Sequence, residues 1–236
     1  MTRIDAARIT ALIPAFNEAE RIGEVVKAAL SAAWLDKLLV VNDGSADETA
    51  AVAAEAGAEV IDLRGNLGKG GALQAGIDAT LENTDIYLFL DADLLGLTRL
   101  HLRQLVRPLL YEPDIVMTVG KFASGRLTTD LSQFVLPILN GQRALRSDFV
   151  RTLPDLREYR YGVEVLLSKI AEKRGQKARE IRLKGLAQVM KEEKQGVMKG
   201  TMQRYKMYYE CLEAWRKYLN AERKKQRKAR RGRTSV

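Results

Sequence analysis

Residues 88–96 read LFLDADLLG, an apolar run that ends in two aspartates, Asp91 and Asp93, separated by one alanine. If the run is a β-strand, side chains two residues apart point to the same face, and the two carboxylates lie side by side. Like charges at this spacing repel each other unless a positive group lies between them. A divalent cation is one such group, because carboxylates are oxygen ligands of the kind that Mg²⁺ prefers. The pair therefore predicts a metal site, with turn and cap chemistry after a buried strand as the alternative.

A second candidate is the glycine-rich stretch NLGKGGAL at 66–73. Its glycines permit close approach of a ligand to the backbone, and Lys69 supplies a positive charge for phosphate. The spacing is not that of a Walker A loop, because Gly70 stands where Ser or Thr would hold magnesium. It is not the GxGxxG dinucleotide fingerprint either, because the stretch follows the third predicted strand rather than the first. An aspartyl-phosphate phosphatase, which DADLL superficially suggests, would have its nucleophile near the start of the chain.

The elements that must position these groups alternate in type along residues 1–96. Apolar runs predict strands at 9–16, 37–43, 59–63 and 86–93, and helical patterns separate them at 18–34, 45–57 and 71–83. This alternation predicts an α/β fold, a Rossmann-like, mostly parallel sheet flanked by helices. Ligands bind at the carboxyl ends of the strands in such sheets. Three polar segments fall there, namely PAFNE (14–18), NDGSADET (42–49) and DADL (91–94).

The second part of the chain has a looser pattern. It predicts a helix at 98–110, a strand at 114–122, a helix at 161–175, a short strand at 178–183 and a long helix at 196–219. Apolar side chains recur at helical spacing in the last helix and predict a packing face rather than a membrane face. They are Met198, Met202, Tyr205, Tyr209, Leu212 and Leu219. We therefore divide the chain into 1–96, 97–195 as the second half of the same domain, this amphipathic helix, and a disordered tail at 220–236.

The charge of the chain is concentrated at its C-terminus. Residues 216–236 hold ten Lys or Arg and one Glu, which accounts for the whole net charge of +9. Such a run is a solvated tail or a contact for an anionic membrane surface. Nucleic acid is disfavoured, because the neutral body shows no basic surface with interleaved aromatic residues. A homodimer through the long C-terminal helix is an open alternative to packing on the chain's own sheet.

Two further observations concern the compartment. The single cysteine, Cys211, excludes an intrachain disulfide framework and favours a reducing environment. The first residues, MTRIDAARIT, lack the apolar region of a secretory signal, and no stretch approaches the roughly 20 apolar residues of a membrane span. The sequence thus predicts a cytoplasmic protein, with peripheral attachment to the inner face of the membrane as an option for the tail.

Four ordered segments, IPAFNEAE, VVNDGSADET, NLGKGGAL and LFLDADL, resemble the successive signatures of glycosyltransferase family 2. The resemblance implies the GT-A fold, a nucleotide-sugar donor with UDP preferred over GDP, and Mg²⁺ or Mn²⁺ to stabilise the diphosphate leaving group. By this resemblance Asp43 contacts the base, Lys69 the base or the diphosphate, and Asp93 with Asp91 the metal. The implied nucleotide-sugar pocket comprises Pro14, Ala15, Asn17, Glu18, Asp43, Gly68, Lys69, Asp91 and Ala92.

The second half resembles a narrower branch, that of glucosyl-3-phosphoglycerate synthase, at SGRLTTD (124–130), GQRALRSD (141–148) and YRYGVEVLL (159–167). The resemblance implies that Arg126 and Thr128 bind an anionic acceptor and that Glu164 touches sugar or acceptor. Arginine suits phosphate, and a carboxylate near a hydroxyl can act as a base. A surface arginine and a helix-start glutamate are the plainer interpretations. The branch's metal-binding histidine is absent, and Gln188 stands near that place.

Together these features predict a metal-dependent glycosyltransferase that moves a hexose to a phosphorylated small molecule or to a polyprenyl or other lipid acceptor. Whether the reaction inverts or retains the anomeric centre is left open. His101, the one histidine, is expected to be solvated or packed rather than a ligand. A sugar nucleotidyltransferase of similar fold is the first alternative, although PAFNEAE is not a glycine-rich loop with Arg and Lys. A non-catalytic module that docks through the tail is the second.

Overall fold

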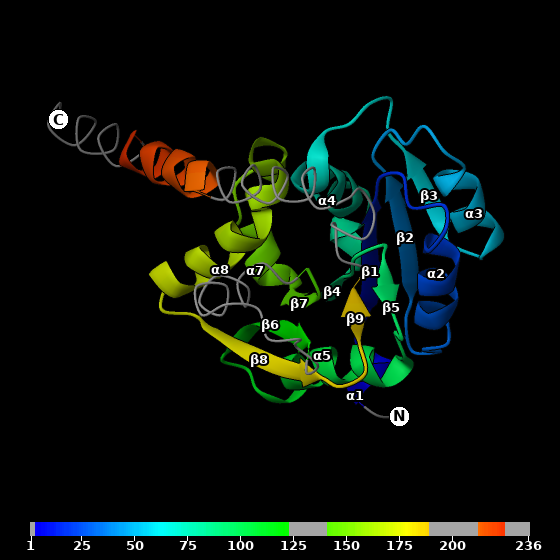
Figure 1. Cartoon of the computed structure of the whole chain (residues 1–236). Coiled ribbons are helices and arrows are strands. Elements are labelled where there is room, and N and C mark those ends of the chain that lie inside the picture. The colour runs from blue at the N-terminus through cyan, green and yellow to red at the C-terminus, as the bar shows by residue number, and fades with distance from the viewer. Residues whose placement is uncertain (1–2, 123–140, 189–211, 225–236) are drawn as a thin grey trace, which may run out of the picture.

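The computed structural model describes residues 3–122, 141–188 and 212–224. Within them a seven-stranded sheet has the order β3-β2-β1-β4-β7-β6-β8 (Figure 1). Its strands are β1 (Ile9–Ala15), β2 (Lys37–Asn42), β3 (Glu59–Asp62), β4 (Ile86–Phe89), β6 (Ile115–Phe122), β7 (Arg143–Arg146) and β8 (Lys177–Leu183). The first four strands are parallel, β7 runs antiparallel to β4 and β6, and β8 is parallel to β6. The predicted mostly parallel α/β sheet is confirmed.

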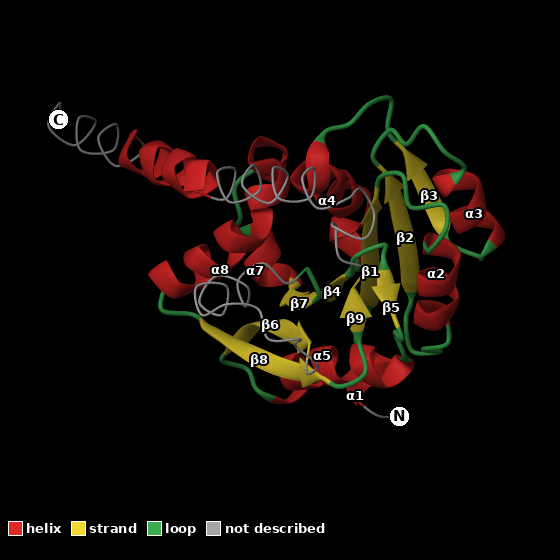
Figure 2. Ribbon diagram, in the orientation of Figure 1, coloured by secondary structure: helices red, strands yellow, loops and turns green. Residues whose placement is uncertain are grey.

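Helices cover both faces of this sheet (Figure 2). Helices α2 (Ile22–Leu30), α3 (Thr49–Glu55) and α5 (Arg99–Tyr111) pack on one face, and α4 (Gly68–Thr80), α7 (Ser147–Arg151) and α8 (Val163–Lys173) pack on the other. Strand β1 contributes to both layers, because Ala11 and Ile13 face the first group while Leu12 faces the second. Alternate side chains of a central strand are thus buried on opposite sides, which explains why these strands are apolar throughout.

The remaining elements are short. They are α1 (Arg3–Ala6), the 3₁₀ segments η1 (Leu81–Asn83) and η3 (Leu156–Gly162), and a two-stranded antiparallel sheet of β5 (Leu94–Leu95) and β9 (Ala187–Gln188). Several predicted boundaries shift. Helix α2 begins at Ile22 rather than at residue 18, because residues after Asn17 form a turn in which the Glu18 carbonyl accepts from the Arg21 amide at 3.0 Å. Helix α4 begins at Gly68, earlier than the predicted residue 71.

The described part of the C-terminal helix, residues 212–224, packs on the body. Ala214 and Tyr218 are each 4% exposed and belong to the core layer beneath α4 and α8. The Tyr218 ring stacks on Trp215 at 5.4 Å, and the Lys173 ammonium lies 5.0 Å from the Tyr218 ring centre. The prediction of a packing face is right for Leu219, which packs on this layer, and wrong for Leu212, which is 72% exposed. The helix continues through residue 224, beyond the predicted boundary at 219.

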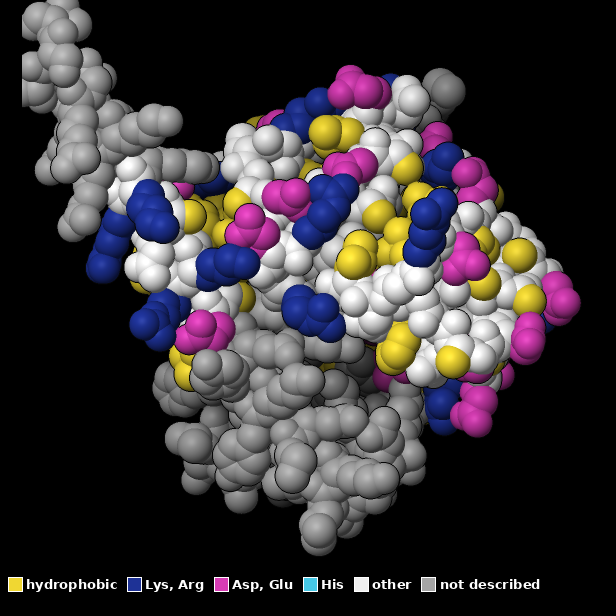
Figure 3. All heavy atoms as spheres, turned by 90° about the horizontal axis from the view of Figure 1, so that it is seen from above, with side chains coloured by type: hydrophobic (Ala, Val, Ile, Leu, Met, Phe, Trp, Pro, Cys, Tyr) yellow, Lys and Arg dark blue, Asp and Glu magenta, His cyan; other side chains and the backbone are white. Residues whose placement is uncertain are grey.

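Several predicted residues fall outside the described ranges, namely Arg126, Thr128, Cys211, the apolar residues Met198, Met202, Tyr205 and Tyr209, and residues 225–236 of the tail. Among the described helices, none is long and apolar enough to cross a membrane. Figure 3 views the molecule from above, toward the carboxyl ends of the parallel strands. Basic and acidic side chains are interspersed across the described part of this surface. This mixture agrees with a neutral body.

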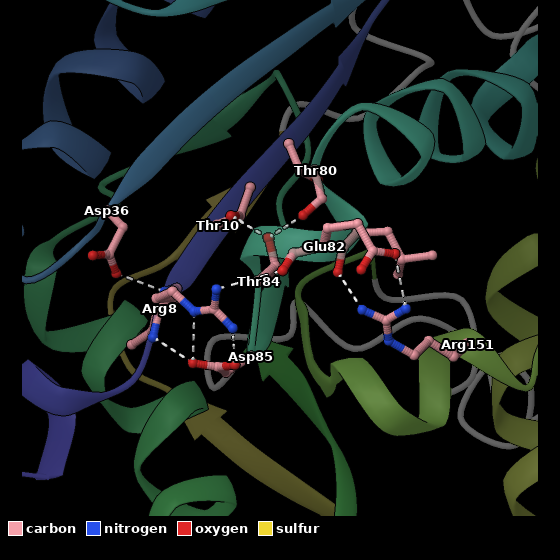
Figure 4. Close-up of polar contacts among 10 residues, drawn as sticks. Arg8, Thr10, Asp36, Thr80, Glu82, Thr84, Asp85 and Arg151 are labelled. Carbon is pink, nitrogen blue, oxygen red and sulfur yellow. Dashed lines mark hydrogen bonds and ion pairs between the residues drawn. The ribbon is translucent and has the colours of Figure 1, made fainter.

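The amino ends of β1 and β4, at the opposite edge of the sheet, are held by a polar network (Figure 4). The Arg8 guanidinium donates to Asp85, with Nη2 at 2.8 Å from Oδ1, and the Arg8 backbone amide donates to Asp85 Oδ2 at 2.9 Å. The hydroxyls of Thr10 and Thr84 are hydrogen-bonded at 2.7 Å in the interior beside it. These contacts tie the first strand to the fourth, and we assign them a structural role.

The Arg8–Asp85 contact gives the fold a pH dependence. The hydrogen bond from Arg8 lowers the pKa of Asp85 below its ordinary value of 3.8. A carboxyl whose pKa falls on folding stabilises the native state above its unfolded pKa and loses that contribution as the pH falls. Asp85→Asn should therefore lower the melting temperature most at pH 7, and the gap to wild type should narrow as the pH falls below about 4. Because both side chains are about half exposed, the effect is small. A gap that is independent of pH in thermal unfolding would contradict this cause.

Candidate active site

The carboxyl ends of β1 and β2 are joined by their own polar side chains. The Asn17 backbone amide donates to Ser45 Oγ at 2.9 Å, and the Asn17 side-chain oxygen Oδ1 accepts from the Ala46 backbone amide at 2.8 Å. The Glu18 amide donates to Thr49 Oγ1 at 2.8 Å. Asn17 has a φ of 54°, a conformation in which asparagine is less strained than most residues. The segments PAFNE and NDGSADET thus meet at one edge of the sheet, as predicted from the strand order.

Asp43 connects this edge to the glycine-rich turn. It is 3% exposed, and its two carboxylate oxygens accept from the Leu67 amide at 2.7 Å and from the Gly68 amide at 2.8 Å. Burial raises the pKa of Asp43, while these two amides and the nearby Arg160 act in the opposite direction. An acceptor at the first residues of α4 satisfies amides that the helix itself leaves unpaired. Asp43 therefore fixes the start of α4, and its predicted contact with a base remains a prediction.

Lys69 forms the centre of the site. Its ammonium is ion-paired with both Asp91 and Glu164, and the three side chains are only 15%, 13% and 11% exposed. Burial by itself would lower the pKa of Lys69, but the two carboxylates outweigh it and raise this pKa above its ordinary value. The second oxygen of Asp91 accepts from Gln142 Nε2 at 2.6 Å. Lys69 thus joins the end of β4 to the start of α8.

Two more charged groups complete this cluster. Glu164 lies in the first turn of α8, and burial raises its pKa while Lys69 opposes the shift. Arg143, on β7, is fully buried, and its Nη1 donates to Ser168 Oγ at 2.8 Å. Burial lowers the pKa of Arg143 to about 10, although Glu164 and Asp91 act against this change. Two cations and two anions therefore balance in a poorly hydrated space, where each depends on its partners.

The placement of the two aspartates corrects the first sequence argument. Strand β4 ends at Phe89, so Asp91 and Asp93 lie in the turn that leads to β5 rather than in a strand. Strand alternation therefore does not place them on one face. The positive group beside Asp91 is the Lys69 ammonium, not necessarily a cation from solution. The carboxylate spacing alone did not decide between these possibilities.

The donor set nevertheless fits Mg²⁺ or Mn²⁺ bound together with a diphosphate. No group of three or more His, Cys, Asp or Glu that could hold a metal occurs among the described residues. Mg²⁺ usually takes one or two carboxylates and completes its shell with phosphate oxygens and water. Asp93, half-buried in the turn, and Asp91, which also accepts from Lys69 and Gln142, are the carboxylates of this set.

The two residues considered in place of the missing histidine differ in position. Gln188, in β9, pairs with Leu94 of β5, directly after Asp93, so the backbone of Gln188 lies beside the aspartate turn. His101 is 6% exposed, and its Nδ1 accepts from the Thr98 amide at 3.2 Å while Nε2 contacts the Lys184 carbonyl at 2.9 Å. His101 is thus packed, one of the two states that the sequence left open. Gln142 and Arg143 were missed, because GQRALRSD gives no local sign that its arginine is buried.

Gly141 offers a test of how tightly this cluster is built. A Cβ at this position would overlap both the Asp91 carboxylate and the Lys69 ammonium. Gly141→Ala should therefore lower kcat about 100-fold, because small displacements of catalytic groups have effects of this size. Gly65→Ala is the matched control, since a Cβ there meets nothing within 4 Å. Equal turnover of the two variants would show that the cluster tolerates the displacement.

The sequence that forms this site matches a known protein family. The family model for glycosyl transferase family 2 matches residues 10–160, which include every segment of the site except Glu164. The chain belongs to glycosyl transferase family 2. The family, the GT-A-type α/β fold and the enzyme class, a nucleotide-sugar-dependent glycosyltransferase, are confirmed.

Two relatives and one solved structure show how far the likeness extends. This glycosyltransferase is 29% identical over 205 residues to an uncharacterized protein of Methanocaldococcus jannaschii, covering 78% of this chain and 84% of that one. It is 35% identical over 111 residues to glucosyl-3-phosphoglycerate synthase of Mycolicibacterium smegmatis, covering 43% of this chain and only 36% of that one. The Mycobacterium tuberculosis glucosyl-3-phosphoglycerate synthase, solved with Mn²⁺, UDP-glucose and phosphoglyceric acid, superposes with a TM-score of 0.69 at 26% identity, covering 80% and 76% of the two chains.

Proposed function

We propose that this glycosyltransferase moves a hexose from a UDP-sugar to a phosphorylated acceptor with the help of Mg²⁺ or Mn²⁺. The observation that carries the proposal is the buried cluster of Lys69 with Asp91 and Glu164 at the carboxyl edge of the sheet. It occurs in a chain that is similar over 80% of its length to a synthase solved with UDP-glucose, Mn²⁺ and phosphoglyceric acid. The same synthase has also been solved with Mg²⁺ and UDP.

The proposed roles follow from the contacts. Pro14, Ala15, Asn17 and Glu18 line the donor pocket at the end of β1, and the start of α4 offers its positive end to the diphosphate. Asp93, with Ala92 and Asp91 in the same turn, holds the metal, which when bound would neutralise charge that grows on the leaving diphosphate. Lys69 keeps Asp91 and Glu164 in place. Glu164 then orients a hydroxyl of the sugar or acceptor, or accepts its proton.

The second part of the proposal concerns the acceptor and the residues that bind its phosphate. Arg126 and Thr128 remain the proposed contacts for its phosphate, and a soluble phosphorylated carboxylate is favoured by the similarity to the synthase solved with phosphoglyceric acid. A polyprenyl phosphate is the second candidate, because the basic residues at 216–236 suit an anionic membrane surface. A cytoplasmic location with peripheral membrane attachment, and a homodimer, likewise stay proposals.

The test is transfer from radiolabelled sugars. Purified protein is incubated with a panel of UDP- and GDP-sugars, with Mn²⁺, Mg²⁺ or EDTA, and with 3-phosphoglycerate or a polyprenyl phosphate in detergent. We expect one UDP-hexose to be consumed only with metal, and to label the phosphorylated acid. The anomeric configuration of the product, read by NMR, decides between inversion and retention. Release of pyrophosphate from UTP and a sugar phosphate would instead support the nucleotidyltransferase. Absence of metal-dependent turnover with every donor would contradict the proposal.

A further inference from the structure

Arg160 lies in a backbone conformation that arginine rarely adopts. Its φ is 38° and its ψ is −120°, at a kink inside η3, shortly before α8 begins at Val163. Among the described residues it is one of two non-glycine residues with positive φ, the other being Asn17. Glycine would adopt this conformation without steric strain. A strained residue that the surrounding structure holds in place is a reason to ask what its side chain does.

The backbone of Arg160 is held directly against the glycine-rich turn. A Cβ on Gly68 would lie 3.2 Å from Arg160 Cα, and a Cβ on Gly70 would lie 3.1 Å from the Arg160 amide nitrogen. Only glycines allow this approach, so η3 and the first turn of α4 fit together around Lys69. The kink in turn sets the start of α8, from which Glu164 reaches Lys69. The kink at residue 160 therefore has a structural role, but glycine would form the same kink with less strain.

The side chain of Arg160 lies at the other end of the turn from the aspartates. Its Nη2 donates to Asn66 Oδ1 at 3.0 Å, and its charge acts favourably on the buried Asp43 carboxylate. Asn66 in turn lies against the end of β2, because a Cβ on Gly44 would be 3.0 Å from the Asn66 amide nitrogen. Lys69 and Arg160, the two cations described beside the glycine-rich turn, thus lie on different sides of it. Lys69 belongs to the side of Asp91 and β4, and Arg160 belongs to the side of Asp43 and β2.

The chemistry of this position points to the base of the donor. A guanidinium has five N–H donors and no acceptor, and within the described residues that of Arg160 makes one hydrogen bond, to Asn66. It is exposed, and the neighbouring Leu67 side chain, which is 44% exposed, offers apolar surface to a planar ring. The Asp43 carboxylate, whose two oxygens accept from amides of the turn, has no hydrogen to donate and so cannot bind a carbonyl oxygen of the base.

We propose that Arg160 is a specificity-determining residue that donates a hydrogen bond to the O4 carbonyl oxygen of the donor's uracil, an inference that rests on the proposed function. Uracil presents the O4 acceptor at the position where cytosine carries an amino group that donates. A donor-only side chain therefore favours UDP over CDP, two ligands of nearly identical size. Arg160 in this role explains why the strained position holds an arginine.

The experiment compares UDP and CDP binding by isothermal titration calorimetry in Mn²⁺, for wild type, Arg160→Gly and Arg157→Ala. Wild type should prefer UDP by about tenfold, the discrimination that one base-edge contact gives. Arg160→Gly should weaken UDP binding by about tenfold and reduce the UDP to CDP ratio to near one. The melting temperature of Arg160→Gly should not fall, because glycine relieves the strain. Arg157, on η3 and paired with Asp78 and Asp155, is the matched control and should bind like wild type.

Each result separates the possibilities. An unchanged UDP affinity in Arg160→Gly, with wild type binding UDP, overturns the inference while leaving the proposed function intact. Equal losses for UDP and CDP with an unchanged ratio also overturn it, because they indicate a contact with a group that both nucleotides share. A KM for the UDP-sugar that rises while kcat is retained, together with the reduced ratio, supports it. Failure of wild type to bind any nucleotide contradicts the proposed function itself.

Discussion

Lys69→Met should abolish transfer and destabilise the fold by about 3–5 kcal/mol, the range measured when one partner of a buried ion pair is removed. Methionine keeps much of the length and apolar volume of lysine but leaves Asp91 and Glu164 without their shared cation. Both carboxylates are largely buried, so neither can recover the lost interaction from water. We expect kcat to fall about 1000-fold, the largest loss that is typical when one preorganised contact is removed. Chemical denaturation and steady-state kinetics measure the two effects separately.

A double variant distinguishes stability from chemistry in this experiment. Lys69→Met with Glu164→Gln removes one buried negative charge together with the cation, so part of the lost stability should return. Transfer should not return, because neither side chain is then present to position the reacting groups. If Lys69→Met alone unfolds at the same denaturant concentration as wild type, the ion pairs of Lys69 with Asp91 and Glu164 do not stabilise the fold. If the double variant regains transfer, Lys69 and Glu164 serve stability alone.

Asparagine at Asp91 and at Asp93 should produce two different defects. Asp93→Asn should lower turnover about 100-fold or more, because loss of the metal contact removes several kcal/mol of charge stabilisation. Asp91→Asn should reduce both turnover and stability, since it leaves the Lys69 ammonium one partner short and disturbs Gln142. Titration of turnover with Mn²⁺ separates the two. Asp93→Asn should need far more Mn²⁺ for half-maximal rate, whereas Asp91→Asn should be slow at every concentration.

The same titration can contradict the assignment. An unchanged Mn²⁺ requirement in Asp93→Asn would mean that this carboxylate is not a metal contact and that the turn has only a structural role. A strongly raised requirement in Asp91→Asn, with normal stability, would exchange the roles of the two residues. Asp78→Asn is a suitable control, because Asp78 is an exposed partner of Arg157 on α4, away from the aspartate turn.

The sequence by itself predicted the family, the parallel half of the sheet and the edge at which the polar strand-end segments gather. Those features depend on local patterns: apolar runs of strand length, the helical segments between them and the polar residues that follow each run. In a parallel sheet all carboxyl ends meet at one edge, so PAFNE, NDGSADET and the aspartate turn could be brought together without knowledge of side-chain contacts. For His101 the sequence left open whether the side chain is solvated or packed, and the structure shows it packed.

Only the tertiary structure decided what holds Lys69 and Asp91. Glu164 lies 95 positions after Lys69, and Gln142 lies 51 positions after Asp91. They meet because β7 enters the sheet antiparallel between β4 and β6, pairing Phe89 with Arg143, while the kink at Arg160 aims α8 at the glycine-rich turn. Neither the insertion of a late strand nor a strained φ has a local sequence signal. The further partners of Lys69 and Asp91 therefore came from distant parts of the chain, and long-range packing rather than local spacing determined them.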